Sequence, residues 1–159
     1  MYIAQSELFK GLGKKALEAV TGQGVEKSYE RGDLVFREGD EARTFYILKD
    51  GAVDLVMGTQ EELCFVVSLP GEIFGWSALV EPYRYRATAR CTAGARLVEI
   101  RHEAVDKMVK DSPEEGVIIF RNLAAIVTEK LRLVYQERIS DADLEGVFFS
   151  TNEGLQRLS

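Results

Sequence analysis

The sequence predicts an α+β protein in which helices flank a small antiparallel β-sandwich or barrel. Turn signals recur every seven to twelve residues between 25 and 101, separated by short runs rich in Val, Phe, Tyr, Ile and Leu. On both sides of this region, apolar residues recur at spacings of three and four, which is the period of a helix. The 159 residues are enough for one domain with its own hydrophobic core.

The first twenty residues are expected to form N-terminal helices, and Ser6 can cap the first turn. Within the β-region, the sharpest local signal is Asp50-Gly51, which separates the strand-like runs 44–48 and 53–57. This dipeptide between two apolar runs predicts a tight hairpin with a type I′ turn.

The chain is expected to become helical again after the β-region. A short helix is predicted at 102–110, and residues 112–115 (Ser-Pro-Glu-Glu) form a strong helix-start pattern. The pattern predicts a long helix over 113–138, with a length of about 37 Å at 1.5 Å per residue.

These elements predict one domain over 1–138, with the barrel at about 25–101, followed by a tail over 139–159. The apolar stripe of the long helix is too wide to be covered by the barrel alone, so a homodimer through this helix is expected. The predicted dimer residues are Phe120, Leu123, Val127, Leu131 and Val134.

Composition excludes several classes of function. A net charge of −6, from 20 basic and 26 acidic residues, argues against nucleic-acid binding by the chain as a whole. His102 is the only histidine, which excludes a metal site of several histidines. The sequence has no nucleophile elbow, phosphate loop or Cys-x-x-Cys motif, so neither an enzyme nor a cofactor is expected.

The cellular location is predicted from two features that the sequence lacks, a membrane-spanning run and a secretory signal. The longest strongly apolar run, 117–120, is too short to span a bilayer, and the N-terminal residues show no secretory signal. Cys64 and Cys91 each lie in an apolar, strand-like run and are expected to be reduced, buried thiols. A cytoplasmic protein that does not contact membranes is expected.

One segment, residues 70–91, has the features of a ligand site. A one-turn helix is predicted at 76–79, preceded by Gly75, which permits a close approach of the backbone. Free N–H groups at the helix start can face an anion, and Arg84 and Arg86 add positive charge. The pattern indicates either a phosphate cradle or a loop that closes the barrel with its arginines in solvent.

Motifs along nearly the whole chain follow the order found in one known family. They lie at 8–12 (LFKGL), 29–40 (YERGDLVFREGD), 45–51 (FYILKDG) and 70–89. The chain thereby resembles the cyclic-nucleotide-binding domain family, specifically the sensor half of regulators of the catabolite-activator and fumarate-nitrate-regulator type. The resemblance implies an antiparallel β-jelly-roll barrel, a phosphate-binding cassette and a C-terminal helix that covers the pocket and often pairs two protomers.

Two departures from the family pattern concern the ligand. Members that bind cyclic AMP carry a glutamate for the ribose 2′-hydroxyl where this chain has Trp76, and an arginine for the cyclic phosphate where it has Tyr85. Losing both groups is expected to weaken binding by about 2–4 kcal/mol, or about thirty- to a thousandfold. Strand alternation predicts that Arg86 points away if Tyr85 points inward. The expected ligand-binding residues are Gly75, Trp76, Ser77, Ala78, Arg84, Tyr85, Arg86 and Ala87.

The expected function is a stand-alone sensor module that binds a small, phosphate-bearing ligand in the barrel, a cyclic nucleotide or another anion, and signals through the long helix. The alternative is a ligand-free dimerisation module with a degenerate pocket, and pocket volume separates the two. A cupin-type enzyme has the same layout, but a single histidine argues against it. About twenty residues follow the long helix, too few for a helix-turn-helix domain, so no DNA binding is expected.

Overall fold

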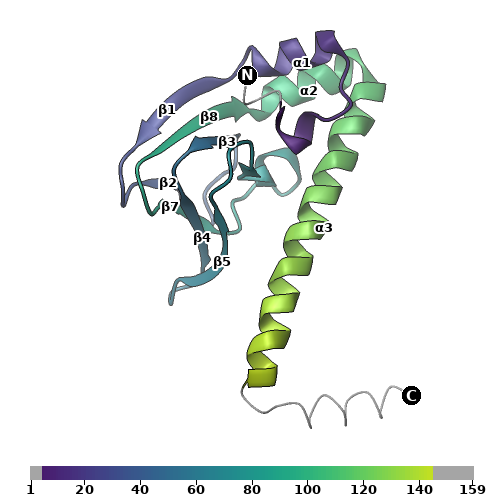
Figure 1. Ribbon diagram of the computed structural model, residues 1–159. Coiled ribbons are helices and arrows are strands. Elements are labelled where there is room, and N and C mark those ends of the chain that lie inside the picture. The colour runs from purple at the N-terminus through teal and green to yellow at the C-terminus, as the bar shows by residue number, and fades with distance from the viewer. Residues whose placement is uncertain (1–4, 145–159) are drawn as a thin grey trace, which may run out of the picture. The chain divides into compact units, whose positions relative to one another are not determined.

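The computed structural model describes residues 5–144 of the chain, which belong to two compact units that meet between Ile126 and Val127. The first unit holds two β-sheets and the helices next to them (Figure 1). The elements in chain order are η2 (Glu7–Phe9), α1 (Lys14–Thr21), β1 (Val25–Tyr29), β2 (Leu34–Phe36), β3 (Thr44–Asp50), β4 (Val53–Met57), β5 (Glu62–Val67), β6 (Ile73–Phe74), η3 (Trp76–Leu79), β7 (Thr88–Cys91), β8 (Ala95–Arg101), α2 (His102–Asp111) and α3 (Pro113–Leu144).

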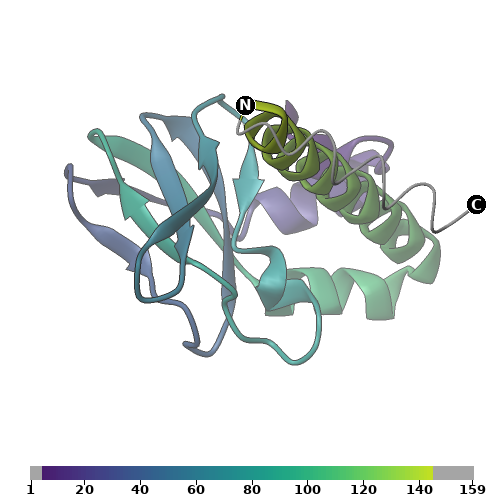
Figure 2. The ribbon, with the colours of Figure 1, turned by 90° about the horizontal axis from the view of Figure 1, so that it is seen from below.

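Eight strands form two four-stranded sheets, with the orders β1-β8-β3-β6 and β2-β7-β4-β5, and every pairing is antiparallel. Figure 2 shows the two sheets facing each other. The first strand begins at Val25 and the last ends at Arg101, which are the predicted limits of the β-region. The predicted fold class, an antiparallel β-jelly-roll flanked by N-terminal helices and a long C-terminal helix, is confirmed.

The predicted hairpin at Asp50-Gly51 is wrong, because β3 and β4 lie in different sheets. Gly51 has the positive φ that the dipeptide predicts, at 98°. A Cβ at Gly51 would collide with the backbone of Gly94 and Ala95, so the turn passes close to the start of β8. The glycine therefore carries the chain from one sheet to the other, and the strands on either side of it find their partners elsewhere.

An aromatic cluster between the sheets forms part of the core. Phe36 of β2 lies with its ring centroid 5.7 Å from that of Tyr46 on β3 and 6.1 Å from that of Phe74 on β6. Phe74 is fully buried, and Phe36 and Tyr46 are less than a tenth exposed. Burial of each such side chain contributes about 1.5–3 kcal/mol, so the cluster stabilises the contact between the two sheets.

The first part of α3 is joined to the N-terminal segment by side-chain hydrogen bonds. The Asn122 side-chain amide donates to the carbonyl oxygens of Leu8 at 2.9 Å and Lys10 at 2.7 Å. The backbone N–H of Gly13 donates to the Glu115 carboxylate at 3.1 Å. These bonds give partners to backbone groups of η2 and of the segment between η2 and α1. They fix the N-terminal segment against the start of α3.

The long helix begins at Pro113, as predicted, and continues to Leu144, beyond the predicted end near 138. α3 therefore includes the first residues of the predicted tail. The remainder of the predicted tail, 145–159, lies outside the described residues. The domain boundary at 138 stays a prediction.

Asn122→Ala is expected to lower the free energy of unfolding by about 1–2 kcal/mol, because it removes both amide hydrogen bonds to the N-terminal segment. Urea denaturation measures this difference. Gln136→Ala, at an exposed position of the same helix, is the matched control and should change stability by less than about 0.5 kcal/mol. Equal stability of the two variants would contradict the anchoring role of Asn122.

Candidate ligand pocket

A cavity of about 130 Å³ lies in the first unit, between the sheet that contains β4, β5 and β7 and the segment that leads into η3. Three groups of residues line it: positions on β2, β4 and β5, the start of η3, and the segment before β7. The lining residues are Phe36, Leu55, Met57, Cys64, Phe65, Gly75, Trp76, Ser77, Tyr85, Arg86 and Ala87. Six of the eight residues expected at a ligand site from the sequence are thus brought together here.

Gly75 lines the pocket at a position that has no space for a side chain. Its φ is 72°, in the left-handed region, and a Cβ at this position would approach Phe36 and Tyr46 to 3.1 Å. Any other residue would therefore be strained and would press on the aromatic cluster. The predicted one-turn helix, Trp76–Leu79, follows directly and is confirmed.

The expected cradle of free N–H groups is smaller than the sequence predicts. The N–H of Ala78 donates to the carbonyl oxygen of Gly75 at 3.2 Å, and its side chain is fully buried. Ala78 therefore belongs to the turn of η3 and not to the pocket lining. Among the residues that the structure describes, the N–H groups of Trp76 and Ser77 have no acceptor, so these two are left for a ligand.

Tyr85 is held in the core by both its ring and its hydroxyl. The ring stacks on Phe36 with centroids 3.8 Å apart and planes 10° from parallel. The hydroxyl donates to the Thr44 carbonyl oxygen at 2.6 Å, and the residue is only 5% exposed. Burial raises the pKa of the Tyr85 phenol, so it is a neutral hydrogen-bond donor at ordinary pH. The hydroxyl is thus committed to the protein backbone and is not free to bind an anion.

The two arginines near Tyr85 differ in position. Arg86 lines the pocket and is exposed, and no ion-pair partner for it is found among the described residues. Arg84 lies outside the lining, and its Nη1 donates to the Gly39 carbonyl oxygen at 3.2 Å. The predicted alternation does not govern Arg86, because the chain bends at Arg86 and Ala87 and β7 begins only at Thr88. Tyr85 and Arg86 consequently border the same cavity.

Trp76 forms an aromatic wall where the family resemblance implies a carboxylate. Its ring lies parallel to that of Phe65 on β5, with centroids 5.8 Å apart and planes 5° from parallel. Both side chains are half-buried and line the cavity. Trp76 is also the single tryptophan of the chain. The sequence predicts the loss of the carboxylate, but the stack depends on how the fold places η3 against β5, which local residue patterns do not show.

Neither cysteine is in a disulfide, as predicted, but only one of them is buried. Cys91 on β7 is 1% exposed, and burial raises the pKa of its thiol. Cys64 on β5 is half-buried and lines the pocket. The prediction of two buried thiols is therefore wrong for Cys64.

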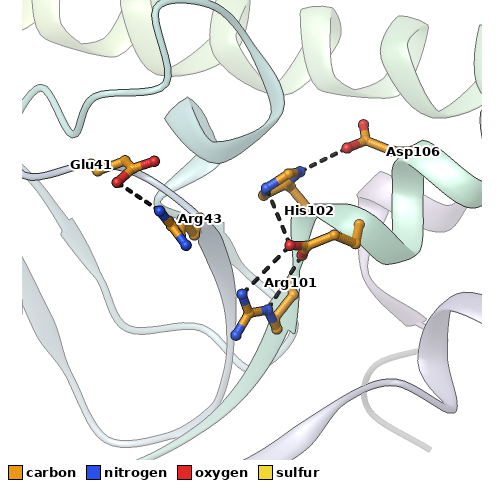
Figure 3. A network of polar contacts seen from close by, with 6 residues as sticks. Glu41, Arg43, Arg101, His102 and Asp106 are labelled. Atoms are coloured by element: carbon orange, nitrogen blue, oxygen red, sulfur yellow. Dashed lines mark hydrogen bonds and ion pairs between the residues drawn. The ribbon is translucent and has the colours of Figure 1, made fainter.

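His102 begins α2, as predicted, and lies within a network of polar side chains at the surface. Its Nδ1 lies 2.7 Å from the Asp106 carboxylate, and its Nε2 lies 3.6 Å from that of Glu103. The labelled residues of the network in Figure 3 are Glu41, Arg43, Arg101, His102 and Asp106. None of them lines the pocket. In the part of the chain that the structure describes, no group of three His, Cys, Asp or Glu residues is placed to hold a metal ion.

The residues predicted for the dimer helix have different surroundings. Leu123 is 5% exposed and packs inside the first unit, whereas Phe120 is 37% and Leu131 is 51% exposed. Val127 and Val134 have intermediate exposure. Leu123 is therefore unavailable to a partner chain, and the other four remain candidates.

Comparison with known proteins identifies the family. The family model for the cyclic nucleotide-binding domain matches residues 26–112, a span that contains both sheets and the pocket. This chain belongs to the cyclic nucleotide-binding domain family. The predicted resemblance is thereby confirmed.

Among curated relatives, the CRP-like cAMP-activated global transcriptional regulator of Mycobacterium tuberculosis is 26% identical over 124 residues, which cover 77% of this chain and 55% of the regulator. This chain therefore spans about half the length of that relative. The transcriptional regulator LdrP of Thermus thermophilus is 33% identical over 140 residues, covering 79% of this chain and 72% of LdrP. Among solved structures, a protein from Geobacter metallireducens matches with a TM-score of 0.72 and 30% sequence identity. The match covers 80% of this chain and 93% of the Geobacter chain.

No helix among the described residues is long and apolar enough to cross a membrane.

Tyr85→Phe is expected to lower the free energy of unfolding by about 1–2 kcal/mol, because it leaves the Thr44 carbonyl without its donor. Chemical denaturation measures the loss. Tyr83→Phe is the matched control, since Tyr83 is 42% exposed and its change should stay within about 0.5 kcal/mol. A Tyr85→Phe protein as stable as the Tyr83→Phe control would show that the buried hydrogen bond is not needed.

Proposed function

We propose that this chain is a sensor module that binds a small anionic ligand in the pocket and transmits occupancy through α3 to a partner. The observation that carries the proposal is the open cavity of about 130 Å³, lined by residues from both halves of segment 70–91. A collapsed pocket would have favoured a ligand-free module. The one charged residue in the lining is Arg86, which is positive and gives the pocket a preference for anions.

Cyclic AMP is not the best ligand for this pocket. The Mycobacterium tuberculosis relative is named as cAMP-activated, but the two groups that would bind the ribose and the phosphate are replaced here. The Trp76 indole cannot accept a hydrogen bond from a ribose hydroxyl. The Tyr85 hydroxyl donates to the Thr44 carbonyl oxygen. We propose that Arg86, with the N–H groups of Trp76 and Ser77, receives the anion instead.

The module itself is proposed to be neither an enzyme nor a DNA-binding protein. The pocket lining contains no acidic residue and no histidine, so it offers no carboxylate or imidazole as a general base. The family match ends at residue 112, and the described residues beyond it form α3. A regulatory role through a partner is the function that these features support.

Thermal unfolding with and without ligand tests the proposal. Inorganic phosphate, sulfate, cyclic AMP and cyclic GMP would each be compared, and a ligand present at a hundred times its Kd adds about 2.7 kcal/mol of stability. At least one anion should raise Tm in a saturable manner, with cyclic AMP weaker than micromolar.

The matched variants for this test are Ala87→Leu and Ala125→Leu. Ala87 lines the cavity, so a leucine there should fill it and abolish the shift, whereas Ala125 is exposed on α3 and should leave it intact. A shift that survives in Ala87→Leu would place the ligand outside the pocket. No shift with any ligand would favour the ligand-free dimerisation module.

A homodimer through α3 is part of the proposal. Phe120, Leu131, Leu133, Tyr135 and Ile139 are large apolar side chains that remain 37–61% exposed along this helix. Exposed apolar surface of this extent is typical of an interaction site. Phe120, Val127, Leu131 and Val134 lie three, four or seven residues apart, which is the spacing of a two-stranded coiled-coil seam.

Light scattering at micromolar concentration should give twice the monomer mass of 17.8 kDa. Leu131→Asp should reduce it to the monomer mass, because a charge at an apolar helix seam is strongly disfavoured. Gln136→Asp adds the same charge away from the seam and should stay dimeric. A monomer in the unmodified protein would contradict the dimer.

A further inference from the structure

The charge of the pocket is positive and comes from a single residue. Of the lining residues only Arg86 is ionised at neutral pH, and none is acidic. The nearby pair Arg90 and Glu61 is bidentate, at 2.7 and 2.6 Å, and lies outside the lining. Arg86 has no such carboxylate among the described residues, so its guanidinium is available to an anionic ligand.

The walls of the pocket are flat and aromatic. Phe36 and Tyr85 form one parallel stack and Phe65 and Trp76 form another, and all four rings line the same cavity. Its volume of about 130 Å³ is well below the range of about 300–1,000 Å³ that is usual for drug-sized ligands. The space suits one small ring better than a base, a sugar and a phosphate together.

A sugar would find few acceptors in this lining. Ribose hydroxyls donate hydrogen bonds, and a buried hydroxyl without a partner costs about 1–3 kcal/mol. The Tyr85 hydroxyl donates to the Thr44 carbonyl oxygen, and at 5% exposure its oxygen offers little accepting surface to a sugar. Beside it the lining offers the Ser77 hydroxyl and the Cys64 thiol, which is a weak acceptor. The pocket is therefore better matched to a ligand without a sugar.

We infer that the pocket selects a small aromatic anion, an aryl carboxylate or aryl phosphate, whose ring packs on the aromatic walls and whose charged group pairs with Arg86. This inference rests on the proposed function, because it names the ligand class of the same pocket. Stacking on aromatic side chains supplies the apolar contact, and the guanidinium supplies a charge-assisted hydrogen bond.

The single tryptophan provides the assay, since Trp76 lines the pocket and the chain has no other indole. The full chain is titrated with phenyl phosphate, benzoate, benzamide and cyclic AMP while Trp fluorescence is recorded. Phenyl phosphate and benzoate should give saturable changes. Benzamide, which has the shape of benzoate without its charge, should bind about ten- to a hundredfold more weakly.

The Arg86→Gln variant should lower benzoate affinity to that of benzamide. Arg84→Gln is the matched control, because Arg84 lies outside the lining and should leave both affinities unchanged. Equal binding of benzoate and benzamide to the unmodified protein would overturn the role of Arg86. Loss of benzoate binding in Arg84→Gln to the same extent as in Arg86→Gln would overturn it as well.

Two outcomes separate this inference from the proposed function. Cyclic AMP binding at least about tenfold tighter than phenyl phosphate, a difference of about 1.4 kcal/mol, would overturn the ligand class and keep the sensor function. No fluorescence change and no thermal shift with any of the anions would overturn both.

Discussion

Tyr85 is fixed in the pocket wall by two contacts. Its hydroxyl donates a hydrogen bond to the Thr44 carbonyl oxygen, and its ring stacks on Phe36. The hydrogen bond joins the segment before β7 to β3, so it links the two sheets through one side chain. A buried carbonyl without its donor is costly, and the Tyr85 ring is also stacked on that of Phe36, with centroids 3.8 Å apart. The hydroxyl of Tyr85 is consequently part of the core, while its ring lines the pocket.

The positive charge of the pocket lies one residue later in this chain than the family resemblance implies. The family resemblance implies an arginine at position 85 for the phosphate, whereas here the charged residue is Arg86, where the chain bends before β7. The carboxylate expected opposite the sugar is replaced by Trp76, which stacks on Phe65. The scaffold of the family is thus retained, with Gly75 in its left-handed conformation, and the pocket in this chain is aromatic, with a volume of about 130 Å³.

Features set by local residue types could be predicted from the sequence. Turn spacing and apolar periodicity predict the limits of the β-region. Local residue types predict the one-turn helix after Gly75 and the start of α3 at Pro113. Pairing between distant strands could not be predicted in this way. Asp50-Gly51 specifies a positive φ but not a partner for β3, and the hydrogen bond of Tyr85 reaches a carbonyl 41 residues away. The availability of Arg86 likewise depends on a bend that the strand pattern does not show.

We propose that the Tyr85 hydroxyl stays in the core while Arg86 receives the anion. A crystal structure of the protein with phenyl phosphate tests it most directly. The phosphate is expected within hydrogen-bond distance of the Arg86 guanidinium, with the ring against Trp76 and the Tyr85 hydroxyl still donating to Thr44. A Tyr85 side chain that has left Thr44 to contact the phosphate, or phenyl phosphate bound elsewhere with the pocket closed, would contradict it.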